Sequence, residues 1–193
     1  MDRRLRRARC RQEGGRHVTT PTDTWHQAVV ITVQGTPAGQ GQISFLGKGR
    51  GARHTNEKTL KPWRAAIITA VRKKTGVHGY LDPRRTGTCV ICRTAKDAHG
   101  LYANIPTGAQ ITITVPKPAN APKRRRSWPI TRYSTDVDHH ARAVLDSLSE
   151  SGVIKDDSQI VDLTVRKVYP GEHPEALPAP GAVIRLYTLG DPS

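Results

Sequence analysis

The chain has few of the features that define secreted or membrane-spanning proteins. It contains three cysteines in 193 residues, an odd and sparse count that argues against a disulfide scaffold and fits a reducing compartment. No run approaches the roughly 18 apolar residues of a membrane span. The basic N-terminus lacks the apolar stretch of a secretory signal. The sequence therefore predicts a cytoplasmic protein with no membrane partner.

Acidic residues are also scarce, because 16 Asp and Glu stand against 31 Lys and Arg, for a formal net charge of +15. This balance predicts a polyanionic partner. Since no basic amphipathic helix with bulky apolar residues stands out, nucleic acid is favoured over an anionic membrane surface. Seven of the sixteen acids nevertheless lie in 136–162, namely Asp136, Asp138, Asp146, Glu150, Asp156, Asp157 and Asp162.

The length and patterning favour one small α+β domain with extensions. Residues 1–27 are predicted to form a disordered basic arm, and 28–190 the domain, with an irregular insertion at about 78–108. Apolar periodicity predicts one helix over 57–75, ended by Gly76, and a second after Asp138, ended by Gly152. Strands are expected at 28–35, at 42–46 as its return strand, and at 109–118, 159–169 and 182–189.

Two basic loops are candidates for contact with DNA. The glycine-rich loop 47–53 is either a plain hairpin tip or a loop that touches phosphate through Lys48 and Arg50. Prolines hold 122–129 as a loop with four consecutive cations, and Trp128 and Tyr133 add stacking surface. The alternative for this second loop is a solvated surface. Its cations are Lys123, Arg124, Arg125 and Arg126.

Cys89 and Cys92, with two residues between them, have the spacing of one ligand pair and so form half of a zinc site. No second Cys-x-x-Cys or His-x₃-His completes it, although His78 and His99 are candidate ligands. Buried or unreactive thiols are therefore favoured over structural zinc.

The acidic segment contains candidates for a metal site. If the chain is extended as it enters the second helix, Asp136 and Asp138 face the same side, about 7 Å apart. A hard divalent ion such as Mg²⁺ suits two such carboxylates. Arg142, four residues beyond Asp138, either pairs with these acids or reaches toward a phosphate. A helix of about 16 Å, followed by a return segment of similar length, brings Asp156 or Asp157 back to the pair.

Each acid also has a structural explanation when taken alone. Thr135-x-x-Asp138 resembles a capping box, Asp156 and Asp157 are ordinary turn residues, and Asp146 is placed as an i+4 partner of Arg142.

The stretches T-D-V-D-H-H-A-R-A-V-L-D (135–146) and G-V-I-K-D-D-S-Q-I-V-D-L-T-V-R-K (152–167) together closely resemble the RusA family of Holliday junction resolvases. The resemblance implies a dimeric domain with a small mixed sheet and two main helices. It also implies a homodimeric, Mg²⁺-dependent endonuclease, with Mn²⁺ able to substitute, that nicks four-way DNA junctions symmetrically.

Carried over by position, Asp136, Asp138 and Asp157 match the family's catalytic, metal-binding aspartates. Asp156 and Asp146 match its accompanying acids, and Lys167 matches a later lysine that we take as a DNA contact. Two positions depart from the pattern, because His139 replaces an asparagine and Arg142 replaces the catalytic lysine. Arginine keeps the positive charge but does not donate a proton.

Two other functions stay open at this point. The first is a non-catalytic protein that binds DNA structures, in which Arg142 and His139 mark a degenerate site. The second is a zinc-containing nucleic-acid module built on Cys89 and Cys92, with the acids acting only as caps.

Overall fold

The computed structural model describes residues 25–41, 43–45, 52–76, 106–122, 125–131 and 134–189. In chain order, its elements are β1 (Trp25–Gln34), β2 (Ile43–Phe45), β3 (Ala52–His54), α1 (Glu57–Thr75), β4 (Thr107–Thr114), α2 (Val137–Ser151), the 3₁₀ turn η3 (Asp157–Gln159), β5 (Ile160–Val168) and β6 (Gly181–Leu189).

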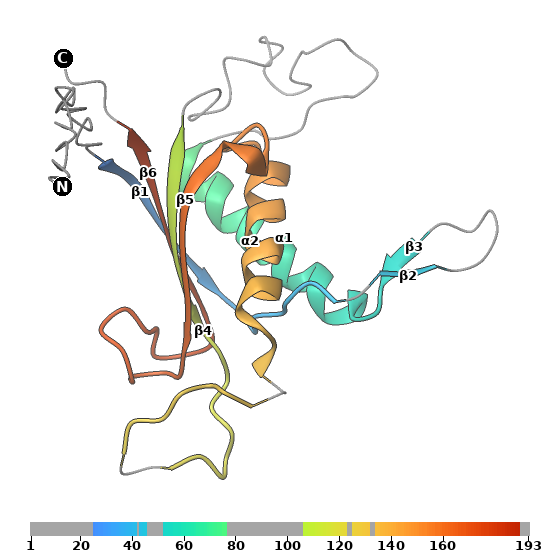
Figure 1. Ribbon diagram of the computed structural model, residues 1–193, viewed down its shortest axis with the longest axis vertical. Helices are drawn as coiled ribbons and strands as arrows, with labels where there is room; N and C mark the ends of the chain where they lie inside the picture. The colour runs from blue at the N-terminus through green and yellow to red at the C-terminus, as the bar shows by residue number, and fades with distance from the viewer. Residues whose placement is uncertain are drawn as a thin grey trace, which may run out of the picture.

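The main sheet has four strands in the order β1-β6-β4-β5 (Figure 1). Strand β6 runs antiparallel to both β1 and β4, whereas β4 and β5 are parallel. A parallel pair needs a long crossover, and α2 lies in the connection between these two strands. The expected α+β domain with a mixed sheet and two helices is confirmed.

Helix α1 has the predicted bounds, because its apolar residues recur at helical spacing and a glycine ends it. Leu60, Trp63, Ile67 and Val71 are buried along one face. Gly76 takes the left-handed conformation, and its N–H donates to the carbonyl oxygen of Arg72 at 2.9 Å.

Helix α2 is longer than expected. It begins at Val137, so Asp138 lies in its first turn rather than in an extended segment, and Gly152 ends it in the left-handed conformation. Its fifteen residues span about 22 Å, not 16 Å. The same-face strand geometry predicted for Asp136 and Asp138 is therefore wrong.

Both helices pack on one face of the main sheet, and the core lies between these layers (Figure 1). Ile111 and Ile184, from the two central strands, are fully buried with Val144 and Leu148 of α2. Part of the opposite face is covered by the connector 170–180. There, Thr112 donates to Glu175 at 2.8 Å, and the N–H of Leu177 donates to Thr114 at 2.9 Å.

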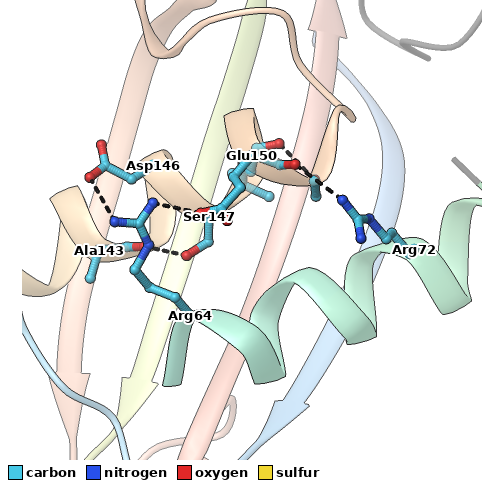
Figure 2. A network of polar contacts seen from close by, with 8 residues as sticks. Arg64, Arg72, Ala143, Asp146, Ser147 and Glu150 are labelled. Carbon is cyan, nitrogen blue, oxygen red and sulfur yellow. Dashed lines mark hydrogen bonds and ion pairs between the residues drawn. The ribbon is translucent and has the colours of Figure 1, made fainter. Parts of the chain in front are cut away.

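An arginine joins the two helices across their exposed edge (Figure 2). Arg64 of α1 lies between Asp146 and Glu150 of α2, at 3.6 and 2.8 Å from their carboxylates. Arg72, two turns further along α1, donates to the backbone carbonyl of Glu150 at 3.3 Å. Asp146 is thus a partner of α1, not of Arg142 as expected.

The return strand predicted at 42–46 exists but does not pair with β1. Strand β2 pairs with β3 in a separate two-stranded ribbon, whereas β1 pairs with β6. After β1, the chain crosses to the start of α2, where the N–H of Gln40 donates to the carbonyl oxygen of His139 at 2.9 Å.

Several predicted positions lie outside the described residues: Lys48, Arg50, Cys89, Cys92, Lys123 and Arg124. Among the helices that the structure does describe, none has the length and apolar content needed to cross a membrane.

Candidate active site at the start of α2

Asp136 stands at the N-cap position of α2 without capping the helix. Its backbone is extended, with φ −75° and ψ 149°, and its side chain makes no capping hydrogen bond. An aspartate at this position usually accepts from a backbone N–H of the first turn. The exposed carboxylate of Asp136 is therefore not occupied by the helix. The predicted Thr135-to-Asp138 capping box is wrong, because Thr135 precedes the N-cap.

Asp138, in the first turn of the helix, has only loose ionic partners. Arg142 Nη2 lies 3.8 Å and His139 Nε2 3.9 Å from its carboxylate. Asp138 and Arg142 have exposed side-chain fractions of 58% and 66%, so solvent screens the pair. Of the two roles predicted for Arg142, the structure has the pairing with Asp138. The long contact leaves both groups accessible to a phosphate.

The backbone just before Asp136 is held by Lys167 from the end of β5. The ammonium group donates to Ser134 Oγ at 3.0 Å and to the carbonyl oxygen of Thr135 at 2.5 Å. Thr135 has a positive φ of 57°. The lysine predicted as a DNA contact is thus bound to the loop that carries the candidate site.

His140 supports the same loop from inside. It is buried in α2, and its Nε2 lies 3.1 Å from the carbonyl oxygen of Ser134. Since a carbonyl only accepts, Nε2 carries the proton. Burial lowers the pKa of His140, and the charges of Lys167 and His139 lower it further, against the raising effects of the Ser134 bond and Asp136. A neutral imidazole is therefore favoured.

The loop after β1 closes tightly on this corner. A Cβ atom added at Gly39 would overlap Thr135 Cγ2 and would lie 2.9 Å from His139 Cβ. Only glycine allows this approach without a shift of the loop that leads to Asp136.

Asp156 and Asp157 lie at the other end of α2. Asp156 caps η3, because its carboxylate accepts from the N–H of Ser158 at 3.0 Å, and Gln159 completes a capping box. The hydrogen bonds with Ser158 lower the pKa of Asp156. The turn role considered for Asp156 fits this geometry, and its carboxylate already has a structural partner.

The three aspartates do not converge within one chain. Helix α2, about 22 Å long, lies in the chain between Asp136 and η3. Strand β5 then runs back, so its far end, with Lys167, reaches the start of α2 (Figure 1). The chain was expected to return before Asp156 and Asp157, but it returns after them, over β5. Within the described ranges, no three His, Cys, Asp or Glu side chains are grouped to hold a metal.

A second feature adjoins the site in the loop 125–131. Arg125 and Arg126 are exposed, and Arg126 Cζ lies 4.2 Å from the ring centroid of Trp128. Glu172 anchors the loop, because it accepts from the N–H of Ser127 at 2.7 Å.

Glu172 also pairs with Lys117. The hydrogen bonds from Lys117 and Ser127 lower the pKa of the Glu172 carboxyl. The carboxylate is therefore charged at neutral pH and holds two separate segments together.

Sequence reasoning missed His140 as a buried support for the site. A usable signal exists, because His140 lies four residues before Val144 on the apolar face of α2. Lys167 had no such signal, since its partner depends on the direction of β5.

Comparison with known proteins bears on the second half of the chain. The family model described as Endodeoxyribonuclease RusA matches residues 90–176. This range includes the described candidates from Arg125 to Lys167, whereas Lys48 and Arg50 precede it. A search of curated proteins finds no match. The resemblance noted from the sequence is confirmed over this range, where the chain matches the RusA family of endodeoxyribonucleases.

Proposed function

We propose that this protein is a Mg²⁺-dependent endonuclease that resolves four-way DNA junctions by paired, symmetric nicks. It acts as a homodimer in DNA recombination and repair, in the cytoplasm of a bacterial or phage-infected cell. The observation that carries the proposal is the uncapped, exposed carboxylate of Asp136 beside Asp138, in a segment matched by the RusA family. The net charge of +15 supports a DNA substrate.

Asp136 and Asp138 are the residues that would hold the metal. Mg²⁺ commonly binds through one or two carboxylates and fills its other positions with waters and substrate phosphate oxygens, so the exposed pair fits. When bound, the ion supplies a nucleophilic water and polarises the phosphate. Arg142 stabilises negative charge on the phosphate, because its guanidinium stays charged and accessible.

A third carboxylate, if the reaction uses one, comes from the second subunit. Asp157 is exposed, whereas Asp156 already caps η3. The length of α2 keeps Asp157 away from Asp136 of its own chain. In a two-fold dimer, Asp157 of each subunit serves the site of the other.

Mixed dimers test the shared site. The Asp138→Asn and Asp157→Asn proteins are each expected to be inactive. The two proteins are unfolded, mixed and refolded together. With shared sites, the heterodimer has one intact site, formed by the Asp136 and Asp138 of one subunit and the Asp157 of the other. The mixture then nicks one junction strand but does not make paired cuts. If each site lies within one chain, the heterodimer has no intact site and no cleavage is recovered. That result would contradict the shared arrangement.

The catalytic proposal itself is tested on a synthetic four-way junction with Mg²⁺, with EDTA, and with Asp138→Asn. Paired nicks are expected only for the unaltered protein with Mg²⁺, with junction binding in all three samples. Cleavage that survives EDTA or the substitution would rule out the metal mechanism. Binding without nicking would favour the non-catalytic alternative, in which Arg142 marks a degenerate site.

Arg125 and Arg126 are the DNA contacts that this proposal retains among the described residues, because both are exposed on the loop that is hydrogen-bonded to Ser134 through Pro129. Each phosphate contact adds to the salt dependence of binding. Lys48, Arg50, Lys123 and Arg124 stay candidates from the sequence.

A further inference from the structure

The loop 125–131 exposes two large apolar side chains next to its cations. Trp128 is 51% exposed and Ile130 is 89% exposed. Single exposed apolar residues are common on protein surfaces and need no explanation. Here two of them flank the buried Pro129, on a loop that also has Arg125 and Arg126.

Hydrogen bonds at both ends fix this loop. The N–H of Ser127 donates to Glu172 at 2.7 Å, and Ser134 Oγ donates to the carbonyl oxygen of Pro129 at 2.7 Å. Between them, the N–H of Ile130 donates to the carbonyl oxygen of Trp128 at 2.9 Å. The exposure of the two side chains is thus built into the loop, and little ordering remains to be done when a partner binds.

The chemistry of the loop selects an aromatic, anionic partner. Arg126 Cζ lies 4.2 Å from the ring centroid of Trp128, so the guanidinium stacks on the indole and places positive charge beside it. A nucleotide offers both complements, a flat base and a phosphate. Bases in duplex DNA already stack on their neighbours, so an unpaired base is the better partner for the exposed ring.

The loop is also close to the proposed scissile phosphate. Pro129 is hydrogen-bonded to Ser134, and Ser134 is two residues before Asp136. At most about 3.6 Å per residue, this connection keeps Ile130 within roughly 15 Å of Asp136. This reach corresponds to a few nucleotides along one strand.

We propose that Trp128 and Ile130 form a binding site for an unpaired nucleobase. Trp128 stacks on the base, and Ile130 keeps the base apart from its neighbour in the strand. The assignment to the branch point of a junction rests on the proposed function. The stacking itself does not, because any DNA with an unpaired base provides the ligand.

Fluorescence of 2-aminopurine provides the test, because stacking against an aromatic side chain changes its emission. The full-length protein with Asp138→Asn is titrated with a four-way junction that contains 2-aminopurine at the branch point or inside one arm. A linear duplex and a duplex with one unpaired 2-aminopurine serve as further probes. The variants are Trp128→Ala, Trp128→Phe, Ile130→Ala and, as a matched exposed apolar control on β5, Val161→Ala.

We expect the protein to change the emission of 2-aminopurine at the branch point and in the unpaired position, but not inside the arm. Trp128→Ala removes this change and weakens binding to these two DNAs by about five- to a hundredfold, the range for one stacked base. Ile130→Ala gives a smaller loss, and Trp128→Phe retains most of the signal. Binding to the linear duplex should be the same for all variants. The Val161→Ala protein should give the same emission change and the same binding as the protein without this substitution.

Three results would overturn the inference. The first is a Trp128→Ala protein that binds the junction normally. The second is an equal loss on the junction and the duplex, which would assign Trp128 to general DNA binding. The third is a loss of the dimer in Trp128→Ala, measured by sedimentation, which would assign the two side chains to contact with a second copy of the chain.

The outcome is separable from that of the proposed function. If the unaltered protein fails to cleave junctions but the emission change at an unpaired 2-aminopurine still depends on Trp128, only the nuclease proposal fails. If cleavage is normal and Trp128→Ala leaves the emission change intact, only the base-binding site fails.

Discussion

The ammonium group of Lys167 donates a hydrogen bond to the carbonyl oxygen of Thr135 at 2.5 Å. Thr135 has φ 57°, a backbone conformation that costs a β-branched residue about 1–3 kcal/mol and persists only where its surroundings hold it. The bond ties the end of β5 to the residue before Asp136. We therefore expect Lys167 to position the segment that carries the candidate metal ligands, rather than to contact a phosphate.

Replacement of Lys167 by methionine separates these two roles. We expect unfolding by urea to show a loss of about 1–3 kcal/mol in the free energy of unfolding, because a charged hydrogen-bond donor is removed from the loop. Junction cleavage should fall, since Asp136 loses its support. The slope of log K against log salt for junction binding should not change.

Arg126→Ala is the matched comparison for Lys167→Met. Because Arg126 is exposed, its loss should reduce the salt slope by about one and leave stability nearly unaltered. A Lys167→Met protein with the same reduction in slope would instead identify Lys167 as a phosphate contact.

Gly39→Ala should damage the site without touching any candidate ligand. The added methyl group meets Thr135 Cγ2 and His139 Cβ, so either the loop after β1 or the start of α2 must move. Overpacking of this kind costs about 1–3 kcal/mol. We expect lower thermal stability and slower junction cleavage.

Thr135→Ser provides the control for the Gly39 substitution, because serine lacks the Cγ2 atom. Added to Gly39→Ala, it should restore part of the lost stability. If the double variant is no more stable than Gly39→Ala alone, the overlap with Thr135 is not the cause.

The helices were predictable from sequence because their signals are local. The apolar residues of α1 and the glycine after it, Gly76, lie within one continuous stretch. The pairing of β2 was not predictable, because the loop that contains Gly39 and Gln40 binds to the start of α2 instead of turning back. That contact joins segments about a hundred residues apart, which local patterning does not report.

The candidate site was predictable in composition but not in geometry. The sequence selected Asp136 and Asp138, and the structure leaves both exposed at the start of α2. The place of Asp157 depended on where the chain turns back after α2. Because that return is a full strand parallel to β4, Lys167 reaches the site and Asp157 stays at the far end.

The Arg64–Glu150 pair should contribute measurably to the packing of α1 on α2. Arg64 Nη2 lies 2.8 Å from Glu150 Oε2, and the Arg64 side chain is only 25% exposed. A double-mutant cycle with Arg64→Met and Glu150→Gln should give a coupling of about 0.5–1 kcal/mol in urea unfolding. The bond from Arg72 should persist, since it uses the Glu150 backbone.

The exposed pair Lys61–Glu57 within α1 is the reference for that cycle. Its coupling should be smaller, about 0.3–0.5 kcal/mol, because the Lys61 side chain is 75% exposed and the two residues share one helix. Equal couplings for the two pairs would mean that Arg64 adds nothing specific to the contact between the helices.

Acid should weaken the anchor of the loop 125–131 through Glu172. The hydrogen bonds from Lys117 and Ser127 lower the pKa of Glu172 below its ordinary value of 4.5, so the unfolded chain takes up this proton first. The stabilisation is complete above about pH 4.5 and is lost as the pH falls through the lowered pKa. Urea unfolding from pH 7 to pH 3 should therefore show a steeper fall in the free energy of unfolding for the unaltered protein than for Glu172→Gln.

Ser127→Ala is the control, because it keeps the backbone N–H and the Lys117 contact. It should retain most of the fall in the free energy of unfolding. An equally steep curve for Glu172→Gln would assign the acid sensitivity to other carboxylates.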